Sequence, residues 1–144
     1  MIQLVTEHID MPAWVSEHEQ DLKQWLRKVA AGYGYKVGNL AYILCDDAKI
    51  LEVNRQFLGH DYFTDVITFD YTTPSCLNGD IFISLDTVKS NAQEVGATEE
   101  QELSRILVHG LLHLTGQGDK TPETKVEMTR KEDLALSKLH ILTI

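Results

Sequence analysis

The chain has 144 residues, 43% of them hydrophobic, and its 22 acidic residues outnumber its 13 basic ones to give a formal net charge of −9. This length predicts one domain over residues 1–144, with a core large enough to fold without disulfides. The sequence has no apolar run of the ~20 residues that cross a bilayer and no signal-like start, so we expect a cytoplasmic protein that does not contact membranes.

The acidic balance also limits the partners that we expect. Proteins that grip nucleic acid by themselves usually present a basic face to the phosphates. A net charge of −9 argues against strong, non-specific RNA binding by this chain alone. An RNA substrate would need to be presented by a partner, or the basic residues would need to cluster around the site.

Other compositional features exclude several classes of chemistry. Cys45 and Cys76 are far apart and form no CxxC pair, which favours reduced thiols over a disulfide or a cysteine metal site. The sequence contains no P-loop, no GxGxxG and no GxSxG segment, so we expect neither a nucleotide cofactor nor a serine hydrolase.

The N-terminal half alternates strands with helices. Residues 1–9 read as a short strand, and Ser16 with Glu19 forms an S-x-x-E capping box that predicts a helix ending at Gly32 or Gly34. A strand over 39–45 and a helix that starts at Asp46 and ends at Gly59 follow.

The C-terminal half begins with two strands and continues with three helices. We predict strands over 64–71 and 80–85, close enough to pair antiparallel. A helix over 87–95 is capped by Asp86, a second opens with the box at Thr98 to Gln101, and a third runs from Pro122 to about Leu139. The charged residues of the third helix, Glu127, Glu132 and Asp133, are read as a solvated face. The fold class is therefore α+β, a small mixed sheet of about four strands packed with about five helices.

The second of these three helices carries the residues that point to chemistry. His109 and His113 are four residues apart, so they share one helix face and can reach one metal ion. Gly116 can adopt a positive φ and turn the chain back, which gives Asp119 a route to the same ion. Two histidines and a carboxylate are the ligand set of a catalytic zinc site, and they favour Zn²⁺ over Mg²⁺. We expect one zinc ion per chain, held by His109, His113 and Asp119, with their helix at the centre of the fold.

A histidine on an apolar helix is more often a hydrogen-bonded core residue than a ligand. The complete spacing His-x3-His-x2-Gly-x2-Asp is far less common than a lone histidine. It equals the H-E-x-x-H-x-x-G-x-x-H spacing of metzincins, with Gly110 where a metalloprotease has its glutamate base.

The same segment, HGLLHLTGQGD, resembles the signature H-G-x-L-H-L-x-G-x-x-H of the YbeY family of metal-dependent endoribonucleases. Further agreement comes in order from Asn54, from Gly59 to Asp61, from Thr64 to Phe69 and from Gly79 to Ser84. The resemblance runs from about residue 40 to about residue 135 and implies a single-domain fold with the Thr64–Asp65 segment near the active cleft.

Two positions depart from the family pattern. Asp119 stands where the family usually has a third histidine, and Leu58 stands where it usually has an arginine. Arg55, one helical turn before Leu58, is the candidate by proximity for the catalytic arginine, with the role of stabilising charge on the phosphate.

The residues alone indicate a metal-dependent hydrolase. The resemblance implies a single-strand-specific endoribonuclease that acts on precursor ribosomal RNA, in 16S 3′-end maturation and ribosome quality control, with the small subunit or its assembly proteins as partners. Two alternatives stay open: a metalloprotease-like hydrolase, and a non-enzymatic ribosome-assembly factor with a structural metal.

Overall fold

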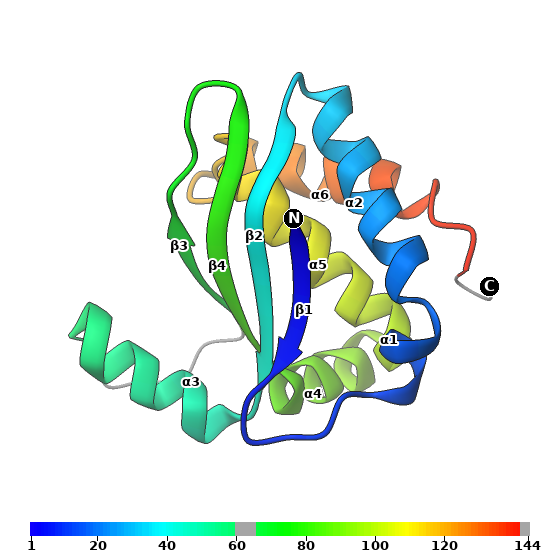
Figure 1. The fold of residues 1–144 in the computed structure, drawn as a ribbon. Coiled ribbons are helices and arrows are strands. Elements are labelled where there is room, and N and C mark those ends of the chain that lie inside the picture. The colour runs from blue at the N-terminus through cyan, green and yellow to red at the C-terminus, as the bar shows by residue number, and fades with distance from the viewer. Residues whose placement is uncertain (60–65, 142–144) are drawn as a thin grey trace.

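A computed structural model describes residues 1–59 and 66–141 (Figure 1). Its described part contains four strands, six α-helices and one π-helical turn, which confirms the α+β prediction. The strands are β1 (Ile2–Thr6), β2 (Lys36–Cys45), β3 (Val66–Asp70) and β4 (Cys76–Ser84). The helices are α1 (Ala13–Glu17), α2 (Glu19–Gly32), α3 (Asp47–Val53), η1 (Asn54–Leu58), α4 (Leu85–Val95), α5 (Glu99–Leu114) and α6 (Pro122–Leu136).

The strands form one mixed sheet in the order β1-β2-β4-β3. The pairs β1–β2 and β2–β4 are parallel, and β3 pairs antiparallel with β4 as expected from the short connection between them. Parallel neighbours require crossover connections. The connection from β1 to β2 contains α1 and α2, and the connection from β2 to β4 contains α3, η1 and β3.

The two faces of the sheet are covered unequally. Side chains such as Leu40, Tyr42 and Ile81 lie on the face that packs against α2 and α5, and they belong to a large core that extends to α6. The opposite face packs against α3 through a smaller cluster of buried residues, namely Cys45, Ile50, Val53 and Ile67. Figure 1 shows α5 running behind the sheet between α2 and α6.

Two buried hydrogen bonds hold the helices of the large core in place. The Tyr42 hydroxyl on β2 donates to the Leu107 carbonyl oxygen of α5 at 2.8 Å, and burial raises the pKa of this phenol. The Trp25 indole N–H on α2 donates to the Ala135 carbonyl oxygen of α6, also at 2.8 Å. Helix α5 is thereby fixed to the sheet and α6 to α2, and the predicted central position of α5 is confirmed.

Some local predictions were wrong. Ser16 does not cap a helix, because the chain enters α1 directly after Pro12 and Ser16 lies inside that short helix; His18 precedes α2 without a side-chain cap. Ser84, not Asp86, accepts the N-terminal bond of α4 from the Thr87 amide. The first two residues of the predicted strand 64–71 and the His60–Asp61 pair lie outside the described residues.

Among the described residues, no helix is both long and apolar enough to cross a membrane. Cys45 and Cys76 are free thiols, as the sequence predicts.

Candidate metal centre

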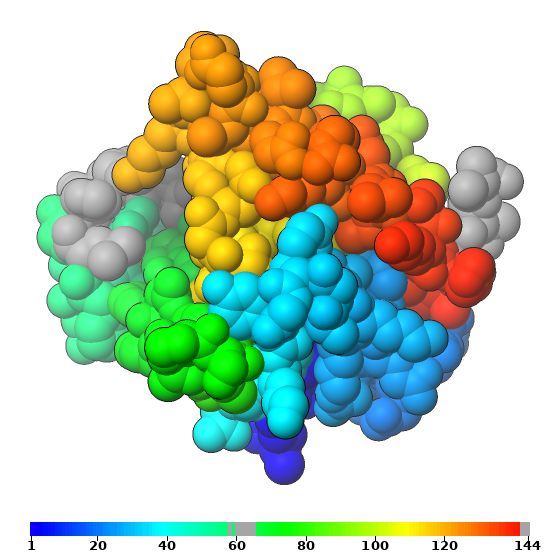
Figure 2. All heavy atoms as spheres, turned by 90° about the horizontal axis from the view of Figure 1, so that it is seen from above, coloured from blue at the N-terminus to red at the C-terminus, as the bar shows by residue number. Residues whose placement is uncertain are grey.

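Helix α5 is buried on almost every side. From Leu103 to Leu114 all residues are buried except Arg105, His109 and His113, which are partly exposed. These three follow one another at intervals of four, so they form one stripe along the helix. The apolar sequence around them therefore leaves one line of polar side chains accessible. Figure 2 shows the C-terminal part of α5 reaching the surface between the β3–β4 hairpin and α6.

The helix ends in a Schellman motif that turns the chain back toward this stripe. The Gln117 amide donates to the Leu112 carbonyl oxygen and the Gly116 amide to that of His113, while Gly116 has a φ of +97°. A residue with a Cβ would be strained at that angle. The loop then brings Asp119 over the two histidines before Thr121 caps α6.

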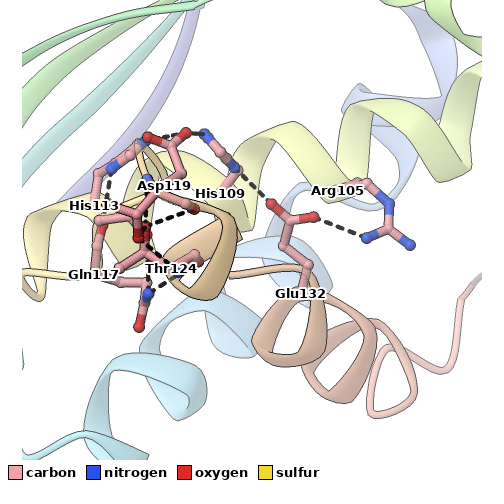
Figure 3. Close-up of polar contacts among 9 residues, drawn as sticks. Arg105, His109, His113, Gln117, Asp119, Thr124 and Glu132 are labelled. Atoms are coloured by element: carbon pink, nitrogen blue, oxygen red, sulfur yellow. Dashed lines mark hydrogen bonds and ion pairs between the residues drawn. The ribbon is translucent and has the colours of Figure 1, made fainter. Parts of the chain in front are cut away.

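Figure 3 shows the two imidazoles and the Asp119 carboxylate pointing toward one another. The Nε2 atoms of His109 and His113 lie 3.5 and 3.4 Å from Asp119 Oδ2, and the three candidate ligand atoms are within 4.8 Å of one another. Donors placed about 2.1 Å from a tetrahedral zinc ion are separated by about 3.4 Å. The structure thus brings the three predicted residues together in an arrangement that fits a zinc ion.

Each imidazole is held from behind through its Nδ1 atom. His113 Nδ1 lies 3.0 Å from the Gln117 carbonyl oxygen, and His109 Nδ1 lies 2.6 Å from Glu132 Oε2. A carbonyl or carboxylate oxygen accepts hydrogen bonds, so both rings carry a proton on Nδ1. Both Nε2 atoms then face the Asp119 carboxylate as unprotonated nitrogens that can ligate a metal ion.

Glu132 is the residue in contact with the candidate site that sequence reasoning missed. Its side chain is only 8% exposed, so its assignment to a solvated face was wrong. Its place on the buried stripe of α6 was a signal, since it follows Met128 by four residues and precedes Ala135 by three. The other two acidic residues are at the solvated positions predicted for them. The side chain of Asp133 is 59% exposed, and Glu127 pairs with Arg130 on the surface of α6.

Arg105 connects Glu132 to the solvated surface. Its guanidinium donates to Glu132 Oε1 at 2.8 Å and to Asp133 Oδ1 at 2.7 Å. Partial burial acts to lower the pKa of Arg105, but the hydrogen bonds to Asp133 and Glu132 outweigh it and hold the pKa above its ordinary value. Arg105 therefore remains a cation that balances the charge of the buried carboxylate.

Gly110 faces the sheet and not the site. A Cβ atom at this position would lie 2.9 Å from Cδ1 of Ile81 on β4, closer than real Cβ contacts. A glutamate here would collide with the sheet, and the position offers no carboxylate to a reacting water molecule. The glutamate that serves a metalloprotease as general base therefore has no counterpart here, and a Cβ at this position would require the Ile81 side chain to shift.

Arg55 does not belong to the cluster formed by His109, His113 and Asp119. It is an exposed residue of η1, which continues α3 on the opposite face of the sheet. Gly59 ends η1 with a φ of +69°, as predicted for a C-cap. The Thr64–Asp65 segment, which the family resemblance implies is near the cleft, lies outside the described residues.

Comparison with known proteins gives a consistent result. Residues 4–140 match the profile of the protein family described as "Endoribonuclease YbeY". Curated proteins of that name include one from Bacteroides thetaiotaomicron, 48% identical over 132 residues that cover 92% of this chain and 94% of that protein. Another, from Phocaeicola vulgatus, is 47% identical over 141 residues that cover 98% of this chain and all of that protein.

A solved structure also resembles this fold. The solution structure of a protein from Thermotoga maritima superposes with a TM-score of 0.70 at 29% sequence identity, covering 96% of this chain and 89% of that one. The likeness extends over the sheet and the helices that carry the candidate site.

Proposed function

This chain belongs to the YbeY family of endoribonucleases, and on that premise we propose that it hydrolyses single-stranded RNA with one zinc ion held by His109, His113 and Asp119. The observation that carries the proposal is the convergence of the two Nε2 atoms and one carboxylate oxygen at 3.4 and 3.5 Å. Two imidazoles with one carboxylate suit zinc better than magnesium, which prefers oxygen ligands.

A cation bound there would polarise a phosphoryl oxygen and lower the pKa of a coordinated water molecule toward ~7. The protein's own residues supply the rest. The Gln117 carbonyl and the Glu132 carboxylate keep a proton on each Nδ1 atom and aim each Nε2 atom inward. Asp119 contributes the negative charge that makes the set attractive to a dication. The reaction adds water across a P–O ester bond, with one strand end keeping the phosphate.

Arg55 is proposed as the cation that offsets charge on the RNA phosphate. Its exposed position on η1 supports this role. We further propose that the substrate is precursor ribosomal RNA, cleaved in the cytoplasm during maturation of the 16S 3′ end. The net charge of −9 supports presentation of that RNA by the small subunit or its assembly proteins, because the chain lacks the excess of cations that autonomous binding uses.

Metal content is the first measurement that tests the site. Elemental mass spectrometry on wild-type protein purified without chelators should find about one zinc per chain. His109→Ala, His113→Ala and Asp119→Ala should each lose it while remaining folded. His140→Ala, at an exposed histidine beyond the C-terminal end of α6, is the matched control and should keep the metal.

RNA cleavage is the second measurement. Zinc-loaded wild type should cut an end-labelled single-stranded RNA internally, leave a duplex of the same sequence intact, and lose at least ~1,000-fold in rate when a chelator removes the metal. A protein that binds zinc but cuts no RNA would instead support a structural metal in an assembly factor. Unchanged zinc content in Asp119→Ala would remove Asp119 from the ligand set.

A further inference from the structure

A continuous line of charged groups leads outward from His109. His109 Nδ1 contacts Glu132 Oε2 at 2.6 Å, Glu132 Oε1 accepts from Arg105 at 2.8 Å, and Arg105 donates to Asp133 at 2.7 Å (Figure 3). The line joins α5 to α6 across 23 residues of sequence. The line ends at the solvated carboxylate of Asp133. Hydrogen bonds between groups of alternating charge therefore connect the partly buried His109 to the protein surface.

The two histidines of the site are supported by different chemistry. His113 is held by the backbone oxygen of Gln117, within its own helix terminus. His109 is held by an ionised side chain from another helix. A carbonyl oxygen fixes the tautomer and the ring orientation, whereas a carboxylate also makes the imidazole a stronger electron donor to a metal ion.

The position of Glu132 gives the second reason to assign it a function. The other buried residues of α6 are Met128 and Ala135, so an apolar side chain at 132 would continue the core. Replacement of a buried ion pair by apolar residues is often neutral or stabilising. Packing of the core therefore does not by itself call for a carboxylate at this point, and the contact with His109 is what distinguishes it from an apolar residue.

We propose that Glu132 is a positioning residue for the metal centre, and that Arg105 holds Glu132 in the required orientation. Glu132 keeps the His109 proton on Nδ1 and aims Nε2 at the point that Asp119 and His113 also face. This inference rests on the proposed zinc site. With a dication bound, His109, His113 and Asp119 carry one net positive charge, which the Glu132 carboxylate balances. Asp133 in turn balances Arg105.

The test is zinc affinity, measured by competition with a chromophoric chelator. Glu132→Gln removes the charge and keeps the shape. If the N–H₂ group of the new glutamine turns toward His109, Nδ1 must accept its hydrogen bond. The imidazole then carries its proton on Nε2, and this proton prevents Nε2 from binding the metal. We expect zinc affinity to fall about 10- to 100-fold, with a changed absorption spectrum of the cobalt-substituted protein. Glu127→Gln makes the same substitution on the same helix, in a carboxylate that also pairs with an arginine, and should leave affinity and spectrum unchanged.

A second variant guards against a folding defect. Arg105→Met combined with Glu132→Met replaces the buried pair by apolar side chains and should fold with a melting temperature near that of wild type. We expect the double variant to lose as much zinc affinity as Glu132→Gln. If both variants bind zinc like wild type, the positioning role is overturned and the zinc site stands. If wild type itself binds no zinc, the proposed function fails first and takes this inference with it.

Discussion

The two faces of the sheet differ in how firmly they hold the residues they carry. On one face α2, α5 and α6 share a large core, and two of the three candidate ligands, His109 and His113, project from α5, its most buried helix. On the other face α3 and η1 rest on a cluster whose buried members, among the described residues, are Cys45, Ile50, Val53 and Ile67. The candidate metal centre is therefore preorganised by packing, whereas Arg55 belongs to a lightly packed element.

A pair of core substitutions should show this difference most strongly. Leu111→Ala on α5 and Ile50→Ala on α3 each empty a fully buried position. Both should cost about 2–5 kcal/mol of unfolding free energy, with Leu111→Ala toward the upper end because it lies in the larger core. Leu111→Ala should also weaken zinc binding, because it loosens the helix between His109 and His113. Urea unfolding and zinc competition measure the two effects.

Ile50→Ala is the control within that pair. It should lower stability and leave zinc affinity at the wild-type value, because the hydrogen bonds that orient the two imidazoles come from α6 and from the loop after α5. Equal losses of zinc affinity in the two variants would show that both faces support the site, and the comparison would be wrong.

Arg55→Ala should produce a smaller effect that is confined to catalysis. We expect RNA cleavage to slow about 10- to 100-fold, equivalent to about 1.4–2.7 kcal/mol of transition-state stabilisation. Zinc content should not change, and unfolding free energy should stay within about 0.5 kcal/mol because the residue is exposed. Single-turnover cleavage kinetics measure the effect.

Arg55→Lys is the matched variant for this prediction. Lysine keeps the positive charge but lacks the planar guanidinium group. A cleavage rate between those of Arg55→Ala and wild type would indicate an effect of charge, and a rate equal to that of Arg55→Ala would indicate a bidentate contact with phosphate. Cleavage by Arg55→Ala at the wild-type rate would remove Arg55 from the catalytic machinery.

Thiol reactivity should give the smallest and most local difference. Burial raises the pKa of Cys45 to about 12, and nearby Asp46 and Glu7 act in the same direction. At pH 8 about one Cys45 thiol in ten thousand is then ionised, and thiolate accumulates only as the pH approaches 12. Cys76 is partly exposed in the β3–β4 hairpin.

Iodoacetamide labelling followed by peptide mass spectrometry distinguishes the two thiols. At pH 8 Cys76 should react at least ~100-fold faster than Cys45. In Ile50→Ala the difference between the two labelling rates should become smaller, because opening of the small cluster exposes Cys45. Equal labelling of both thiols in wild type would mean that this cluster is not closed in solution.

The sequence by itself determined much of the fold and the inner part of the site. The strands and main helices, the antiparallel β3–β4 pair and the convergence of His109, His113 and Asp119 all follow from local rules. A four-residue interval sets two side chains on one helix face, and one glycine at positive φ returns the chain over them. All three residues lie within eleven positions, so few conformations compete.

Only the tertiary structure decided what surrounds that inner part. Glu132 reaches His109 because α6 packs on α5. The mixed charges of α6 predicted a solvated face, and only the packing of the helix shows that Glu132 lies on its buried side. Gly110 faces Ile81 because α5 lies on β4, and the element that carries Arg55 follows α3, which packs on the other face of the sheet. Contacts between distant segments depend on how whole faces pack together, and no local spacing specifies which residues then meet.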